Sequence, residues 1–233
     1  MAYFTGPNIV TDDLKLAVDA GSERSYPGSG TTTTNIINGA SGTLTNGVGF
    51  SSSNGGAFDF DGADDYISIA HSTALQNASN LTLEAWVKID TNTNSYLGII
   101  GKGTTDANEE YCIILSPGNE TLYMDVGQGG GPYVAPGYTF DINTWYHIVG
   151  THERTSGVST LKIYVNGVYQ PATVIGPFNT PNTNTAAVTI GSRFANGGIP
   201  WAGEISLARI YTRTLPDMEV LQNFNAQKSR FGL

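Results

Sequence analysis

The feature that most constrains the fold is the alternation of side chains in two neighbouring segments, AFDFDGADDYISI (residues 57–69) and LTLEAWVKI (residues 81–89). In the second segment, Leu, Leu, Ala, Val and Ile share one face, while Thr, Glu, Trp and Lys share the other. A period of two residues is typical of β-strands whose faces meet unlike surroundings. The two segments therefore predict strands that bury one face in a core.

Composition fits one large β-domain over residues 1–233. Apolar residues make up 39% of the chain, charged residues only 13%, and the 29 glycines suit many short strands joined by turns. Residues 1–55 hold one expected strand, LKLAVDAG (residues 14–21), and long turn-rich loops with too few apolar residues for a core of their own. The net charge of −9 and the pI near 4.6 argue against binding to nucleic acid or to anionic membranes.

Further strands are expected at short intervals along the rest of the chain. Asn166-Gly167 lies between two short apolar runs and predicts a tight hairpin, because both central residues of a type I′ turn need a positive φ. The expected fold is an antiparallel sandwich of two sheets. The other predicted strands lie near residues 96–103, 111–115, 121–126, 145–153, 160–168, 187–192 and 201–212.

One short C-terminal helix is expected over residues 215–227. Pro216 suits the first turn, and the acidic residues that follow suit the positive end of the helix dipole. Met218, Leu221 and Phe224 recur at helical spacing, with Val220 alongside. This stripe is predicted to pack on an edge of the sandwich.

The order of several segments resembles a known family. AFDFDGADDYISI, LTLEAWVKI, GIIGKG, WYHIVGTHE, LKIYVNGV and WAGEISLARIYTRTL together resemble the laminin-G-like, concanavalin-A-like lectin/glucanase superfamily. The resemblance implies a jelly-roll sandwich that binds a ligand. The two ends, DLKLAVDAGSERSYPGSGTT and EVLQNFNAQKSRFGL, look like laminin-G-like virion proteins of tailed bacteriophages, many of them marine or cyanobacterial.

That second resemblance implies a protein on the virion surface, of decoration, fibre or adhesin type. It would be present in several copies and would contact other virion proteins as well as itself. No secretory signal is visible in MAYFTGPNIV, which fits synthesis in a host cytoplasm. A carbohydrate of the host cell surface is the expected ligand.

Asp61, Asp64 and Asp65 are the candidate metal ligands. Ca²⁺ takes six to eight oxygen ligands, and an acidic turn that contains a glycine supplies several. The same residues also suit a plain turn in which the carboxylates accept backbone hydrogen bonds. The sequence therefore predicts either a structural Ca²⁺ site or a self-capped turn.

A departure from the family's pattern bears on this site. The late strand of the family often reads GxIDEVRIY, and here it reads GEISLARIY, with Ser206 and Leu207 in place of the two acids. If those acids help to hold calcium in relatives, Glu204 would have to substitute for them here.

The three tryptophans are candidate platforms for stacking against sugar rings. Trp86 and Trp145 lie within predicted strands and are expected to fill the space between the sheets. Trp201 opens a strand after the loop 195–200, so we expect it to be partly exposed and to contact the ligand.

The loop GQGGGPYVAPGY (residues 127–138) is the other candidate for ligand binding. Glycine and proline set its turns, and Tyr133 and Tyr138 offer amphipathic contact area. The same segment also suits a passive connection between strands.

Catalysis is not expected. A retaining glycosidase needs two carboxyl groups about 5–5.5 Å apart, whereas the face that carries Glu84 continues with Trp86 and Lys88. Glu109 and Glu110 are adjacent and should diverge on a strand. We therefore expect a virion surface protein with a lectin-like fold. The alternatives are a calcium-dependent carbohydrate-binding module without a virion role, and a glycoside hydrolase.

Overall fold

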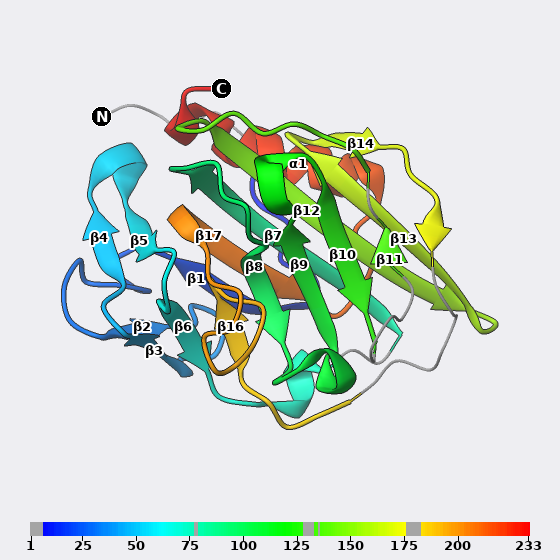
Figure 1. Ribbon diagram of the computed structural model, residues 1–233, viewed down its shortest axis with the longest axis horizontal. Coiled ribbons are helices and arrows are strands. Elements are labelled where there is room, and N and C mark those ends of the chain that lie inside the picture. Colours follow the sequence, from blue (N-terminus) through cyan, green and yellow to red (C-terminus); the bar gives the residue numbers. More distant parts are fainter. Residues whose placement is uncertain (1–6, 77–78, 128–132, 135, 176–182) are drawn as a thin grey trace.

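The computed structural model describes residues 7–233 except 77–78, 128–132, 135 and 176–182. Two antiparallel β-sheets pack face to face, which confirms the expected all-β sandwich (Figure 1). The first sheet contains β1 (Leu14–Asp19), β4 (Gly49–Ser51), β5 (Ala57–Asp61), β7 (Asn80–Ile89), β12 (Trp145–Thr155), β13 (Val158–Val165), β14 (Val168–Gln170) and β17 (Ala202–Tyr211). The second contains β2 (Thr32–Thr34), β3 (Ser41–Thr45), β6 (Tyr66–Ile69), β8 (Leu97–Lys102), β9 (Tyr111–Leu115), β10 (Leu122–Val126), β11 (Tyr133–Val134), β15 (Val174–Ile175) and β16 (Val188–Ile190).

The strand order in each sheet mixes distant parts of the chain. Within the described residues, the first sheet runs β14-β13-β12-β7-β17-β5-β4, with β1 also paired to β17. The second runs β15-β11-β10-β9-β8-β16-β6-β3-β2. Short 3₁₀ helices interrupt the connections at η1 (Ser53–Gly55), η2 (Thr73–Leu75), η3 (Asp106–Asn108) and η4 (Pro117–Asn119).

The main core lies between the sheets, and β7 shows how the sequence builds it. Its leucines at 81 and 83, with Ala85, Val87 and Ile89, are buried in this core, as the alternation predicts. Ala85 lies opposite Ile148 on one side and Ala208 on the other. Apolar side chains of both sheets form this one core cluster, and their removal from water is the main stabilising term.

The hairpin between β13 and β14 also follows the prediction. Val165 pairs with Val168, and the two residues between them, Asn166 and Gly167, have φ angles of 52° and 77°. Residues 7–55 contain more strands than expected, however. The segment predicted to form turn-rich loops contributes β2, β3 and β4. β3 pairs with β6 and carries β2 on its other side, and β4 pairs with β5.

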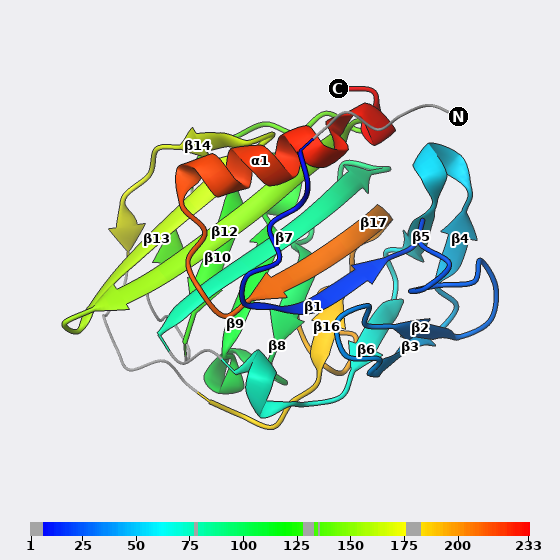
Figure 2. The same ribbon diagram turned by 180° about the vertical axis from the view of Figure 1, so that it is seen from behind.

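Helix α1 (Asp217–Gln227) and the 3₁₀ helix η5 (Lys228–Phe231) form the C-terminal segment. The segment lies across the outer face of the first sheet, not on the edge of the sandwich (Figure 2). The predicted apolar face is confirmed for Val220, which is buried, and for Phe224, which stacks on Trp86, but it is wrong for Met218, which is 75% exposed. Asn223 is buried instead. Asn223 faces inward because its amide donates to Glu84 Oε2 at 2.8 Å.

The C-terminal segment also covers two tryptophans and accounts for their burial. Trp86 and Trp145 are buried, but beneath this segment on the outer face of the first sheet, so their expected place between the sheets is wrong. The Trp86 ring stacks on Phe231 with centroids 4.0 Å apart. In the part of the chain that the structure describes, no helix has the length and apolar character needed to cross a membrane.

Candidate functional site

The turn between β5 and β6 places three carboxylates at the rim of the sandwich. Asp61 Oδ1 accepts a hydrogen bond from the Ala63 amide at 2.8 Å, and Asp65 Oδ2 accepts one from the Asp61 amide at 3.1 Å. Gly62 supplies the positive φ of 79° that the reversal requires. The turn is therefore closed by its own side chains, as one of the two sequence interpretations required.

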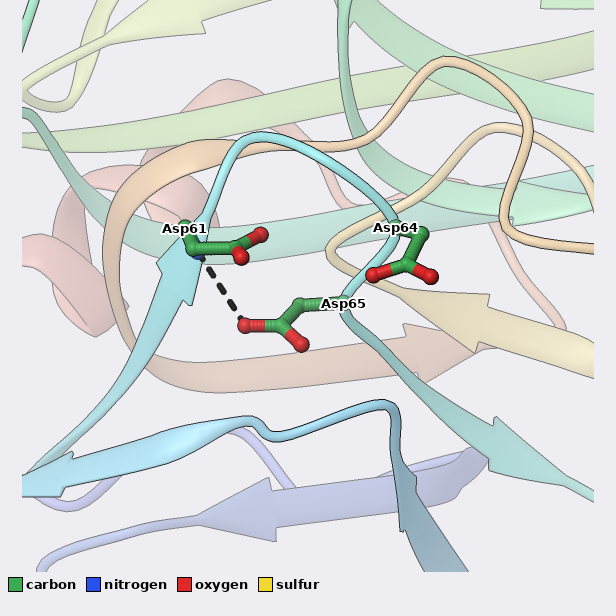
Figure 3. A group of neighbouring side chains, drawn as sticks. All are labelled: Asp61, Asp64 and Asp65. Atoms are coloured by element: carbon green, nitrogen blue, oxygen red, sulfur yellow. Dashed lines mark hydrogen bonds between the residues drawn. The ribbon is translucent and has the colours of Figure 1, made fainter.

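The carboxylates of Asp61, Asp64 and Asp65 also converge. One oxygen from each lies within 4.8 Å of the others, and Figure 3 shows the three groups around the interior of the turn. Asp61 and Asp64 are exposed, whereas Asp65 is buried and its Oδ1 has no hydrogen-bond partner. Burial raises the pKa of the Asp65 carboxyl, and the two neighbouring carboxylates add to the rise.

The donor set of this turn fits calcium. Carboxylate oxygens are the hard ligands that Ca²⁺ prefers. Two oxygens of the cluster accept backbone hydrogen bonds, which leaves Asp64 and the second oxygens of Asp61 and Asp65 for a cation. The unpartnered Asp65 Oδ1 is a group whose burial costs free energy unless something compensates it.

Glu204 does not join this cluster. It lies on β17 opposite Asp59, and its Oε2 is 3.1 Å from Lys88 Nζ. Ser206 and Leu207, where acids were expected from the resemblance, lie against the C-terminal segment instead. Ser206 Oγ donates to Gly56 O and accepts from Arg230, both at 2.6 Å.

A groove of about 580 Å³ adjoins the acidic turn. Its most prominent side chain is Tyr96, which is 43% exposed and makes an edge contact with the Tyr123 ring at 6.1 Å. Ile199, on the far wall, has a φ of 61°, a strained conformation for a β-branched residue that is typical of functional sites. The groove is lined by Gly62, Ala63, Thr93, Asn94, Ser95, Tyr96, Leu97, Pro117, Ile199, Pro200 and Ala202.

Tyr96 is the residue that the sequence interpretation missed. It ends the polar run DTNTNSY (residues 90–96), directly before β8. A large aromatic side chain at the end of a polar loop was a signal that it could be held at the surface. Tyr96 lines a groove only because its loop packs beside the acidic turn, and the sequence does not show this packing.

Trp201 was expected to be partly exposed, and this is wrong. The side chain is fully buried in the main core. The pairing of Ser192 with Pro200 closes the preceding loop, and the Trp201 amide donates to Gly191 O at 2.9 Å. The indole is thereby buried, and it cannot serve as a surface platform in this fold.

The tyrosines of the loop 127–138 have separate surroundings. Tyr138 is half-buried and packs against Phe140 and Tyr146, at centroid distances of 4.7 and 6.1 Å. It is not among the residues that line the groove. Tyr133 joins β11 through its backbone, opposite Asp125, and its side chain and residues 128–132 and 135 lie outside the described residues.

A buried ionic cluster occupies the outer face of the first sheet beneath α1. Glu84 Oε1 lies 2.7 Å from Arg209 Nη1 and 3.1 Å from His147 Nε2, and Asn223 donates to its other oxygen. All four residues are buried. Burial by itself raises the pKa of Glu84, but Arg209 and the two hydrogen-bonding neighbours outweigh it and lower the value to about 2.

A half-buried acid lies on the second sheet. Asp125 is opposite Cys112 in the ladder, and burial together with the nearby Glu109 carboxylate raises its pKa to about 7. Glu109 is held by Arg193 at 2.6 Å, while Glu110 forms an ion pair with Lys102 at 2.8 Å, so the two adjacent glutamates diverge as predicted. Cys112 is a buried strand thiol, also as predicted.

Comparison with known proteins identifies the class. Residues 61–221 match the family model described as the concanavalin A-like lectin/glucanases superfamily, and the chain belongs to this family. No curated protein sequence matches it. The fold is lectin-like, with a rim of loops that carries the acidic turn and the groove.

Solved structures with the same fold include proteins seen with sugars. Domain 4 of an extracellular arabinanase from Geobacillus stearothermophilus, in complex with arabinotriose, has a TM-score of 0.67 and 16% identity over 91% of this chain and 98% of that chain. The ligand binding domain of botulinum neurotoxin serotype D, in complex with N-acetylneuraminic acid, gives 0.69 and 14% over 93% and 51%.

A sialidase from Trypanosoma rangeli, in complex with the inhibitor DANA, gives a TM-score of 0.65 and 15% identity over 99% of this chain. The chain spans about a third of the length of that sialidase, since 35% of it is covered. At these identities the likeness concerns the fold alone.

Proposed function

We propose that the protein binds carbohydrate and that the groove beside the acidic turn is the saccharide site. The observation that carries this proposal is the partly exposed ring of Tyr96, next to the hydroxyl and amide groups of Thr93, Asn94 and Ser95. An aromatic face packs against the apolar face of a sugar ring, and polar side chains beside it supply directional hydrogen bonds.

The family and the fold neighbours support this proposal. The arabinanase domain holds arabinotriose and the neurotoxin domain holds N-acetylneuraminic acid. A lectin-like sandwich is thus a scaffold that presents sugar sites in unrelated proteins, and the rigid sheets here hold the loops of the groove.

We further propose that Ca²⁺ binds the acidic turn as a structural ion. Asp64, the second oxygen of Asp61 and the unpartnered Oδ1 of Asp65 are the protein ligands in this proposal. Gly62 and Ala63 belong both to the turn and to the groove wall. An ion in the turn would therefore hold one wall of the sugar site in place.

Binding without hydrolysis is the proposed mode of action. Glu84 is buried and neutralised by Arg209, so it is not available as an acid or a nucleophile. Glu109 is likewise buried and paired with Arg193. The groove itself is lined by no carboxylate within the described residues, whereas a glycosidase needs two that flank the bond to be cleaved.

We propose a bacteriophage virion surface as the biological setting, with several copies on each particle. The support is the resemblance of residues 13–32 and 219–233 to laminin-G-like virion proteins. Repeated copies make weak sites effective, because multivalency raises avidity by about 10²–10⁴ without new contacts. The alternative is a calcium-dependent carbohydrate-binding module that acts away from a virion.

The groove is tested by a glycan array probed with a multimerised form of the protein. Tyr96→Ala should lower binding to every positive glycan by about tenfold, because stacking area is lost. Tyr169→Ala is the matched control, since Tyr169 is 37% exposed but lies on β14, outside the groove lining. Binding that survives Tyr96→Ala would place the site elsewhere.

The virion setting is tested separately by mass spectrometry of purified phage particles. The protein should be found in the particles in several copies. Its presence only in the lysate of infected cells would contradict the virion role and would leave the carbohydrate site to be judged by the array.

A further inference from the structure

The charged side chains on the turn that forms one wall of the groove are all negative. Asp61 and Asp64 are exposed on the turn whose Gly62 and Ala63 form part of the groove lining. All eleven lysines and arginines of the chain lie within the described residues, and none of them lines the groove.

The cations on neighbouring elements are held by other acids. Lys88 on β7 contacts Glu204 at 3.1 Å and Asp90 at 3.7 Å. Arg193, which precedes Ile199 in the loop before β17, contacts Glu109 at 2.6 Å and Asp106 at 2.8 Å. Neither side chain is therefore set up to receive the carboxylate or sulfate of a ligand.

The remaining groove walls are neutral. Thr93, Asn94 and Ser95 offer hydroxyl and amide groups, and Leu97, Pro117 and Pro200 are apolar. Such a surface can satisfy the hydroxyls and the apolar face of a sugar ring. A negatively charged sugar would instead lose part of its hydration next to Asp61 and Asp64 with no lysine or arginine in return. A Ca²⁺ ion on the three ionised carboxylates of the turn would still leave this cluster with a net charge of −1.

We propose that the groove selects uncharged saccharides and rejects carboxylated or sulfated ones. This inference rests on the proposed function, since it names the class of glycan for the same site. It separates this protein from fold neighbours that were solved with N-acetylneuraminic acid, a carboxylated sugar. The discriminating residues are Asp61 and Asp64, which act by repulsion while Tyr96 supplies attraction.

The test uses an array of neutral oligosaccharides, each printed beside its sialylated and its sulfated derivative, with binding read in calcium and in EDTA. The wild-type protein should bind neutral parents at least about tenfold more tightly than their charged derivatives in both buffers, a ratio that corresponds to about 1.4 kcal/mol. Asp64→Lys should shift this ratio toward the charged derivatives by about tenfold.

Glu153→Lys is the matched control, because it makes the same change of net charge at an exposed position beside α1, in a separate cavity. It should leave the ratio within about twofold of the wild type, since Glu153 does not line the groove and an exposed charge is screened by salt. The inference is overturned if charged derivatives bind as well as their parents, if carboxylated glycans bind only in calcium, or if Asp64→Lys leaves the ratio unchanged. An array with no binding at all overturns the proposed function as well.

Discussion

Two groups of acids in this protein have opposite surroundings. Glu84 lies beneath α1 on the outer face of the first sheet, where Arg209, His147 and Asn223 satisfy both of its oxygens. The acidic turn at the rim instead brings three carboxylates within 4.8 Å of one another. A buried charge has to be compensated within the fold, whereas exposed carboxylates that are not neutralised by the protein can attract or repel a ligand. We therefore propose that the first group serves stability and the second recognition.

The largest effect is expected at Glu84. Glu84→Ala should lower the free energy of unfolding by about 3–5 kcal/mol, because Arg209 would remain buried without its partner. Urea denaturation followed by tryptophan fluorescence measures this. Glu23→Ala at an exposed position is the control and should stay within about 0.5 kcal/mol of the wild type. A small change at Glu84 would mean that the two regions do not differ in the proposed way.

The same group gives a pH dependence of known sign. The pKa of Glu84 is about 2 in the folded state, below its ordinary value of 4.5. Its contribution to stability is therefore complete above about pH 4.5 and is lost as the pH falls toward 2. The wild-type protein should show this loss in acid, and Glu84→Ala should not.

Calcium should stabilise the protein through the acidic turn of Asp61, Asp64 and Asp65. At a concentration about 100-fold above its dissociation constant, Ca²⁺ should stabilise the protein by about 2.7 kcal/mol, which raises the melting temperature. Asp65→Asn should abolish this rise, although its side-chain carbonyl can still accept the hydrogen bond from the Asp61 amide. Asp141→Asn, at an exposed position outside the cluster, should keep it. Equal melting curves in calcium and EDTA would speak for a turn that needs no ion.

Asp125 fits neither group of acids. It is largely withdrawn from solvent, yet its negative charge is not fully compensated by neighbouring donors or cations. Its Oδ1 has no hydrogen-bond partner, and its pKa is raised to about 7 by burial and by Glu109. A raised pKa means that the stabilising protonated form is lost as the pH rises, so stability should fall by about 1–3 kcal/mol between roughly pH 4 and 7. Asp125→Asn should remove this fall. A fall of the same size in the variant would assign it to other groups.

The smallest effect is expected in a hydrolysis assay. Incubation with arabinan and with β-glucan should release no reducing ends, because the acids of the first group are buried and those of the second surround no bond to be cleaved. Turnover that Glu84→Gln or Asp125→Asn abolishes would show instead that one of the buried carboxyl groups is catalytic.

Much of the fold could be predicted from residues that are close together in the sequence. The alternation in residues 81–89 predicted which side chains of β7 enter the main core, and Asn166-Gly167 predicted the hairpin. The turn 61–65 was likewise visible as a carboxylate cluster. Strand period, turn dihedrals and the convergence of side chains four residues apart are local properties, so the local sequence carries them.

The surroundings of single side chains were decided by segments far away in the sequence. Trp201 is buried because the loop before it is closed by Ser192, and Tyr96 lines a groove because its loop meets the acidic turn. Asn223 faces inward and Met218 outward because Glu84, 139 residues away from Asn223, lies beneath the helix. The sequence by itself determined the strands and the charged turn; exposure, ion pairing and the shape of the site depend on long-range packing, which only the tertiary structure brings together.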